Sequence, residues 1–459
     1  MQRCVFLSLL AATLVPRGAA VGQATPPQAQ PVAFVGVNLI PMDRERVLEN
    51  QTVVVRNGRI TAVGPVASTP VPPDARRIAA AGRYLIPGLA EMHAHIPAPQ
   101  AGAAFTERVL YLYVAAGITT IRGMLGQPSH LELRQRLERG ELVGPRVWTS
   151  GPSASDNSVN SPAQAQSLVT AQHAAGYDFI KIHPGLTRAE FDALDATADR
   201  LGRRYAGHVP VDVGVPRALE AGYWTIDHLD SYLHTLVADG APVDLNGSGG
   251  FFGIAFVPHL DQAKIAPMAR ATQAAGVWNV PTQILMENLA NDEDPDAMAQ
   301  RPELRYMPAQ MVAGWVQQKR NFLAQNPSAE TRRRFIEVRR QLVKALHDAG
   351  AGLLLGSDAP QWWNVPGFSA LRELEALVAA GLTPYQALET GTRNVAVYFG
   401  VADRAGTIEL GKQADLVLLD ANPLADVRNV WQRAGVMVRG AWLPADDLAA
   451  RLNQFAASR

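Results

Sequence analysis

Six side chains that could bind a metal ion or move a proton are spread between residues 93 and 358. They are His93, His95, Lys181, His208, His228 and Asp358. Residues two apart on a strand point to the same side, so both imidazoles of His93-Ala94-His95 could face one site. Imidazole nitrogen and carboxylate oxygen suit zinc, and also manganese, iron or cobalt. The set therefore predicts a metal-dependent active site.

Each of the six lies at or near the end of a short apolar segment that is typical of a strand. These segments are residues 89–93, 119–122, 146–150, 179–183, 205–208, 225–228, 278–282 and 352–358. Helical stretches separate them, and eight such βα units favour a closed parallel barrel whose catalytic groups lie at the carboxyl ends of its strands. We therefore expect an α/β fold with a (β/α)8 TIM-like barrel over residues 86–400.

Shorter β-like segments flank the barrel region on both sides. They are residues 32–40, 52–55, 59–63, 405–410, 414–419 and 436–443. Asn57-Gly58 is a strong hairpin turn. We expect residues 32–85 and 401–445 to form one small β-sandwich domain built from both chain ends, with a C-terminal helix or tail at 446–459. Residues from about 286 to 345 are charged and helical and resemble a barrel insertion of the kind that forms lids.

The N-terminal 24 residues predict a signal peptide. Arg3 is followed by an apolar run over residues 4–15, too short to span a bilayer, and then by small residues that favour cleavage after Ala20 or Ala24. A Pro/Gln-rich linker follows at residues 25–31. We expect a secreted or periplasmic protein with no membrane segment in its mature form. The only cysteine, Cys4, would be removed, which excludes disulfides and cysteine-bound zinc.

The composition is that of a globular chain and is consistent with a small-molecule substrate. Hydrophobic residues make up 47% and charged residues 18%, enough for a sizeable core. Lys and Arg number 42, as do Asp and Glu, so no basic excess indicates a nucleic-acid partner. The composition is compatible with a homo-oligomer.

Several motifs carry a resemblance to a known family. Pro87-Gly-Leu-Ala-Glu-Met-His-Ala-His95 resembles the opening signature of the amidohydrolase superfamily, and the order HxH, Lys, His, His, Asp resembles its binuclear branch. The stretches 371–375, 380–384 and 406–417 add to the likeness, which covers residues 32 to about 440. The chain looks similar to imidazolonepropionase-like and prolidase-like members.

The resemblance implies a role for each of the six residues. His93, His95 and Asp358 would hold the more buried of two divalent ions, and His208 and His228 the more exposed one. Lys181, carboxylated by carbon dioxide, would bridge them. The ions, zinc by preference, would acidify a bridging water to hydroxide, and Asp358 would take its proton and pass it to the leaving group. The reaction implied is cleavage of a C–N bond in an amide, dipeptide, N-acyl amino acid or cyclic amide, or of an ester.

Three positions depart from the family pattern: Glu91 and Gly123 stand where aspartate is usual, and Val209-Pro210 replaces the Ala-Tyr of related dipeptidases. Two alternatives therefore stay open. One is a mononuclear imidazolonepropionase-like or deaminase-like hydrolase with an unmodified Lys181. The other is a non-catalytic exported binding protein on the same scaffold.

Four further residues are candidates for substrate contact. They are His183, Tyr232, Trp362 and Trp363. His183 lies two residues after Lys181, so both side chains could face the same side. The two tryptophans follow Asp358 and could form an aromatic wall, although packing of their own loop explains them equally well.

Overall fold

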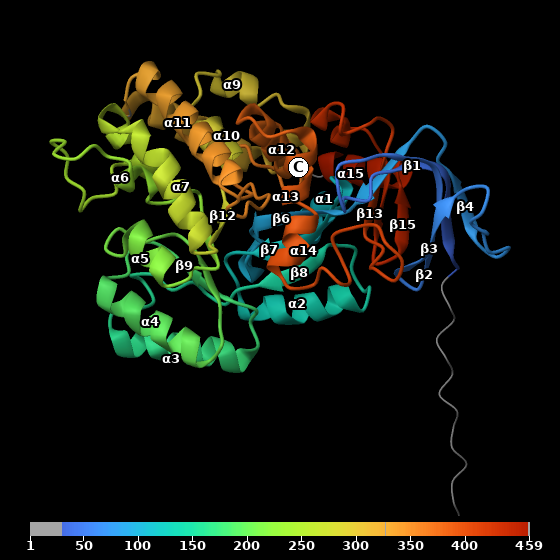
Figure 1. Cartoon of the computed structure of the whole chain (residues 1–459), viewed down its shortest axis with the longest axis horizontal. Coiled ribbons are helices and arrows are strands. Elements are labelled where there is room, and N and C mark those ends of the chain that lie inside the picture. Colours follow the sequence, from blue (N-terminus) through green and yellow to red (C-terminus); the bar gives the residue numbers. More distant parts are fainter. Residues whose placement is uncertain (1–29, 326, 458–459) are drawn as a thin grey trace, which may run out of the picture.

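The computed structural model describes residues 30–325 and 327–457 (Figure 1). The predicted signal peptide at residues 1–24 lies outside the described residues, as does the linker up to residue 29. In the described part of the chain, no helix is both long and apolar enough to cross a membrane.

Seven parallel strands lie at the centre of the fold in two sheets. The first sheet contains β6 (Leu89–Ala94), β7 (Ile118–Gly123) and β8 (Arg146–Thr149). The second contains β9 (Ile180–Ile182), β10 (Tyr205–Gly207), β11 (Thr225–Asp227) and β12 (Trp278–Val280). Isolated parallel bridges from Ser150 to Phe179 and from Ala154 to Ile182 join the two sheets. The carboxyl ends of all seven strands therefore lie at one edge of the arrangement.

The predicted eighth strand, residues 352–358, is not a regular strand in the structure. It makes single parallel bridges instead, from Leu353 to Asn279 of β12 and from Ala359 to Ala94 of β6. Its backbone leaves the extended path at Asp358, which has a φ of 65°. A left-handed residue cannot continue a strand ladder, so a prediction from the apolar pattern alone overestimates the strand.

Helices follow most of these strands and cover the parallel sheets from outside. They are α1 (Ala103–Ala115), α2 (Pro128–Glu138), α3 (Pro162–Ala175), α4 (Arg188–Arg200), α5 (Gly214–Glu220), α6 (Tyr232–Thr235) and α7 (Ile265–Ala274). Local sequence starts several of them. In α4 the Thr187 side chain accepts from the backbone of Glu190, whose own side chain reaches back to the Thr187 backbone, a capping box.

The region predicted as an insertion is almost wholly helical. It contains α8 (Gln283–Ala290), α9 (Pro295–Met298), α10 (Ala309–Gln325) and α11 (Ala329–Asp348). In α11, Phe335, Val338, Leu342 and Leu346 are buried at a spacing of three and four residues, which lies on one helix face. That face packs against α7 and α8, so α11 is part of the outer helical layer.

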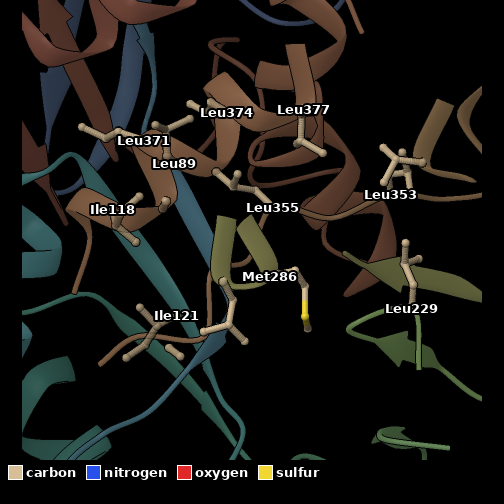
Figure 2. Packing of buried hydrophobic residues seen from close by; sticks show 14 of the residues in the cluster. Leu89, Ile118, Ile121, Leu229, Met286, Leu353, Leu355, Leu371, Leu374 and Leu377 are labelled. Atoms are coloured by element: carbon tan, nitrogen blue, oxygen red, sulfur yellow. The ribbon is translucent and has the colours of Figure 1, made fainter. Parts of the chain in front are cut away.

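The core between strands and helices is made of aliphatic side chains. Leu371, Leu374 and Leu377 of α12 (Phe368–Ala379) belong to the same buried cluster as Leu89 and Leu355 (Figure 2). Full burial of each leucine contributes roughly 1.5–3 kcal/mol. This packing fixes β6, which carries His93, and it fixes the segment that leads into Asp358. Two short helices, α13 (Pro384–Thr390) and α14 (Arg393–Tyr398), follow α12.

Strands from both chain ends form one mixed sheet of eight strands beside the parallel strands (Figure 1). They are β1 (Val32–Leu39), β2 (Leu48–Arg56), β3 (Arg59–Pro65), β4 (Arg76–Ala79), β5 (Tyr84–Pro87), β13 (Leu416–Leu419), β14 (Arg433–Val438) and β15 (Ala441–Pro444). The antiparallel pair of β5 and β13 joins the two ends. Phe34 and Met437 share a separate buried cluster there. Hydrogen bonds connect all eight strands into one sheet. The sandwich arrangement expected from the sequence stays a prediction. Helix α15 (Ala445–Ala457) closes the chain against β14 and β15.

Candidate active site

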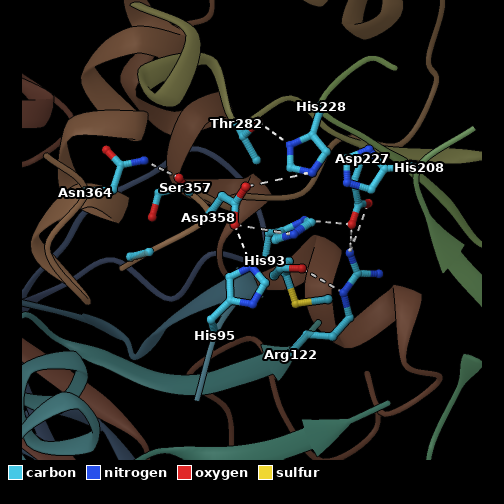
Figure 3. Close-up of polar contacts among 12 residues, drawn as sticks. His93, His95, Arg122, His208, Asp227, His228, Thr282, Ser357, Asp358 and Asn364 are labelled. Atoms are coloured by element: carbon cyan, nitrogen blue, oxygen red, sulfur yellow. Dashed lines mark hydrogen bonds and ion pairs between the residues drawn. The ribbon is translucent and has the colours of Figure 1, made fainter. Parts of the chain in front are cut away.

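Five of the six predicted residues, His93, His95, His208, His228 and Asp358, come together at the carboxyl ends of the parallel strands (Figure 3). The sixth, Lys181, lies on β9 and interacts electrostatically with Asp358. The ring centroids of His93 and His95 are 5.4 Å apart, those of His93 and His228 4.4 Å, and those of His208 and His228 4.6 Å. His93, His228 and Asp358 each offer a ligand atom, and these three atoms lie within 4.8 Å of one another. All three residues are buried. A cluster of this kind, drawn from separate strands, is suited to holding a metal ion.

Asp358 is at the centre of the cluster. Its Oδ1 lies 2.6 Å from His95 Nε2 and 3.6 Å from His93 Nε2, and its Oδ2 lies 3.8 Å from His228 Nε2. Burial by itself would raise the pKa of Asp358, but the neighbouring histidines and Lys181 outweigh burial and hold it well below the usual value. The group is therefore a carboxylate at neutral pH, able to bind a cation or accept a proton.

The backbone beside Asp358 is fixed by a buried polar network. Glu91 accepts hydrogen bonds of 2.6 Å from both the backbone N–H and the hydroxyl of Ser357. Asn364 donates to the Ser357 carbonyl. Burial raises the pKa of Glu91 to about 7. The glutamate that departs from the family pattern thus holds the loop that carries Asp358.

His93 is oriented by a carboxylate that the sequence analysis missed. Nδ1 of His93 lies 2.8 Å from Asp227 Oδ2, which leaves Nε2 facing Asp358. Arg122 donates to both oxygens of Asp227 at 3.1 and 3.0 Å, and the Thr225 hydroxyl donates at 2.6 Å. Arg122 and Asp227 are fully buried charges on the short strands β7 and β11. A charged residue inside a segment that is expected to be a buried strand is unusual, and this was the sequence signal that could have identified both residues.

Two of the other three histidines, His208 and His228, also have Nδ1 held by a neighbouring group. Nδ1 of His208 lies 2.9 Å from Asp230 Oδ2, and Nδ1 of His228 lies 2.9 Å from the Thr282 hydroxyl. Each contact engages Nδ1 and leaves Nε2 available, as in metal-ligating histidines whose second nitrogen is held by a neighbouring group. Burial lowers the pKa of His93 and His228 well below the usual value. Both rings are therefore neutral at pH 7, the form that binds metal.

Lys181 is a fully buried amine at the same site. Its Nζ has no hydrogen-bond partner among the described residues. Burial lowers its pKa to about 8. Gly207 makes room for the side chain, because a Cβ there would lie 2.8 Å from Lys181 Cδ. A buried polar atom without a partner is expensive, so this amine calls for a ligand or a modification.

The four candidates for substrate contact separate into different surroundings. Nδ1 of His183 lies 2.8 Å from the Ser153 hydroxyl, and its ring centroid is 5.2 Å from that of His208. Burial lowers the pKa of His183 to about 2, so it is a neutral hydrogen-bonding group beside the cluster.

Tyr232 and Trp363 belong to the core instead. The hydroxyl of Tyr232 is fully buried and bonded to Thr272 and Asn279 at 2.9 and 3.0 Å, which gives it a structural role in place of the expected contact with substrate. Trp363 is 1% exposed, and its ring lies 5.8 Å from Lys319 Nζ. The expected aromatic wall of two tryptophans is therefore reduced to Trp362, whose ring packs 5.7 Å from that of Phe251.

A phenylalanine that the sequence analysis did not single out lies over the histidines. The ring centroid of Phe252 is 5.3 Å from that of His228 and 6.2 Å from that of His208. Its backbone is in the left-handed region with a φ of 47°, in the glycine-flanked segment η2 (Phe251–His259). Strain of this kind costs on the order of 1–3 kcal/mol and concentrates at functional sites.

Two cavities bear on the choice of site. One of about 370 Å³ is bordered by His208, Asp230 and Phe252, and so reaches the cluster at His208. Another of about 500 Å³ is bordered by Gly88, Thr120 and Arg146, near the opposite ends of the strands. None of the six predicted residues lines the second cavity. Of these two cavities, only the first is bordered by one of the six predicted residues, His208.

Comparisons with known proteins agree with this geometry. The model of a family described as the amidohydrolase family matches residues 84–443. An imidazolonepropionase from Geobacillus sp. is 24% identical over 85% of this chain and 90% of that enzyme. An adenine deaminase from Ruegeria pomeroyi is 27% identical, over only 37% of this chain and 30% of its own length. A crystal structure of a Xaa-Pro dipeptidase with bound methionine shares the fold, with a TM-score of 0.65 and 20% identity over 90% of this chain and all of that one.

Proposed function

Because the chain belongs to the amidohydrolase family, we propose that it is a metal-dependent hydrolase that cleaves a C–N bond in an amide, dipeptide or cyclic amide, or the bond of an ester. The observation that carries the proposal is the convergence of His93, His228 and Asp358, whose ligand atoms lie within 4.8 Å of one another beside the unpartnered amine of Lys181.

The same proposal includes a closed (β/α)8 barrel. The bridges from Ser150 to Phe179 and from Asn279 to Leu353 support closure, as does the bridge from Ala94 to Ala359. With the ladders inside the two parallel sheets, these bridges support a ring of hydrogen bonds through all eight central segments. A closed ring would direct all six predicted side chains into one mouth.

Two divalent cations, zinc by preference, fit the donor set. His93, His95 and Asp358 would hold one, and His208 and His228 the other. When bound, the cations would acidify a water molecule and polarise the scissile carbonyl. The described contacts support this arrangement because Nδ1 of His208 and of His228 is hydrogen-bonded and Nδ1 of His93 lies 2.8 Å from Asp227 Oδ2, while Nε2 of each ring is available.

Lys181 would join the two halves of the site as a carbamate. A neutral amine adds to carbon dioxide, a C–N bond forms and a proton leaves, so a lysine must first lose its charge. The lowered pKa of about 8 enlarges the neutral fraction at pH 7, and the partnerless burial of Nζ supplies a reason for the modification.

The protein's own groups would then handle the proton and the substrate. Asp358, ionised at neutral pH, would accept the proton of the attacking water and donate it to the leaving nitrogen or oxygen. His183, neutral and next to His208, could accept a hydrogen bond from an N–H of the substrate or donate one to its oxygen. Phe252 would exclude bulk water from the histidines.

A substrate screen with metal counting tests this proposal. Protein reconstituted with zinc is assayed on dipeptide, N-acyl amino acid, lactone and phosphotriester libraries, with and without a chelator. We expect chelator-sensitive hydrolysis, two metal equivalents per chain and a loss of one carbon dioxide on acidification. One equivalent and no carbon dioxide would favour the mononuclear alternative. Rates unchanged in Asp358→Asn would favour the binding-protein alternative.

We also propose that the chain is exported through residues 1–24. The support is the arrangement of Arg3, the apolar run at residues 4–15 and the small residues up to Ala24. Sequencing the N-terminus of protein recovered outside the cytoplasm tests this. A start at Val21 or Thr25 is expected, and an intact Met1 in exported protein would contradict it.

A further inference from the structure

We propose that the part of the substrate next to His208 is apolar and carries no carboxylate, so that neutral or amine-bearing amides and esters are preferred over N-acyl amino acids and free dipeptides. The inference rests on the proposed function and names the substrate class of the same site. Its support is the set of charges around the cavity of about 370 Å³.

The walls of this cavity are mainly hydrocarbon. Leu186, Val209, Val211, Phe251 and Phe252 line it beside His208. Phe252 extends the apolar wall onto the cluster, since its ring also lies against His228. An apolar group entering here would be removed from water, whereas an ionised group would lose its hydration and need a partner.

The charged residues on the wall are all acidic. None of the described residues that line the cavity is a lysine or arginine, while Asp212 and Asp230 both line it. Asp230 is engaged by His208 and by the backbone N–H of Ser231 at 3.1 Å, so Asp212, which is exposed, supplies the less committed charge. His234 also lines the cavity, and its Nε2 lies 3.0 Å from the Gly247 carbonyl.

The arginines nearest to the cluster are already committed elsewhere. Arg122 is fully buried and bonded to both oxygens of Asp227. Arg339 is fully buried and donates to the carbonyls of His228 and Pro281 at 2.9 Å each. Neither guanidinium lines the cavity. Away from the proposed metal ions, a substrate carboxylate would therefore meet two acidic side chains and no described lysine or arginine on the wall, an arrangement that selects against it.

Matched compounds that differ only in charge test the inference. One pair varies the amine side: N-acetyl-phenylalanine against its N-methylamide. A second set varies the acyl side: succinyl, butanoyl and 4-aminobutanoyl phenylethylamide. For each compound, kcat/KM and the calorimetric dissociation constant are measured on zinc-loaded protein. In at least one set, we expect kcat/KM and affinity to be about ten-fold higher for the neutral compound than for its carboxylate partner. The amine-bearing compound should at least equal the neutral compound in both quantities.

A charge reversal on the wall supplies the second arm. Asp212→Arg should raise kcat/KM and affinity for the carboxylate members and lower both for the amine. Asp403→Arg makes the same charge change at an exposed residue that does not line the cavity, and should leave the selectivity unchanged.

The outcomes separate the two proposals. Carboxylate members that bind and react as well as neutral ones in both sets, with no response to Asp212→Arg, would overturn the inference and leave the hydrolase proposal standing. Absence of chelator-sensitive hydrolysis of any compound would count against the hydrolase proposal, and the dissociation constants would still decide the charge preference.

Discussion

Asp227 Oδ2 lies 2.8 Å from Nδ1 of His93, at the buried side of the candidate metal centre. The carboxylate is fixed in turn by two hydrogen bonds from Arg122, at 3.1 and 3.0 Å (Figure 3). Arg122 on β7 thus fixes the carboxylate of Asp227 on β11. That carboxylate in turn orients the imidazole ring of His93 on β6. Groups that hold the second nitrogen of a ligating histidine fix its tautomer and strengthen its binding to metal.

The first prediction concerns Asp227. Asp227→Asn should weaken zinc binding by about ten- to one-hundred-fold, because an amide orients His93 less strongly and does not neutralise Arg122. Competition with a chromogenic chelator measures the affinity. Asp230→Asn, at the histidine on the exposed side, is the matched comparison. An unchanged affinity in Asp227→Asn, with folding intact by circular dichroism, would remove this role from Asp227.

A second prediction concerns Asp358. Asp358→Asn should lower kcat by roughly 10²–10⁴-fold, because the amide cannot accept the proton of the attacking water. The backbone next to Asp358 is held by the hydrogen bond from the Ser357 N–H to Glu91, so the fold should survive the isosteric change to asparagine. Steady-state kinetics at full metal occupancy checks this. If restoring occupancy also restored kcat, Asp358 would be a ligand only.

A third prediction uses the pKa of Lys181, which burial lowers to about 8 from a usual 10.5. Between these values the unfolded chain binds a proton at this lysine that the folded chain does not, so stability must rise with pH. In metal-free protein kept free of carbon dioxide, the rise contributed by Lys181 should approach about 3 kcal/mol between pH 8 and 10.5. Urea unfolding across this range measures it. Lys181→Met should lose this part of the slope, and equal slopes in both proteins would contradict the lowered pKa.

The fourth prediction concerns Tyr232. Tyr232→Phe should leave KM unchanged and lower the free energy of unfolding by about 1–3 kcal/mol, since Thr272 and Asn279 lose a buried partner. Denaturant unfolding and steady-state kinetics check the two parts. His183→Ala is the contrasting variant, because that ring lies 5.2 Å from His208 and should change KM. A raised KM in Tyr232→Phe would return the tyrosine to the site.

Much of the site could be predicted from residue type and position along the chain. The two-residue spacing of a strand predicted that His93, in β6, and His95, directly after it, face the same side, and apolar runs that end in polar residues indicated the other candidate ligands. The family motif added the expected order of the ligands. These properties are local, because a strand end and a two-residue spacing are visible within a few residues.

The orientation of each ligand could not be predicted. Nδ1 of His93 meets Asp227 only because β6 and β11 are brought together across the parallel strands, 134 residues of sequence apart. Adjacent residues on a regular strand point to opposite sides, and the φ of 63° at His228 breaks that rule immediately after Asp227. No local pattern reports such a turn.

The sequence by itself determined which residue types were available for chemistry and on which strands they lie, since periodicity and strand ends are local properties of the chain. Tertiary structure decided which of them share a site. It placed Tyr232 and Trp363 in the core, Phe252 over the histidines and Asp212 beside a cavity bordered by no described lysine or arginine. Burial, ring contact and the sign of the charge around a cavity depend on residues far apart in sequence, and only the folded chain brings those together.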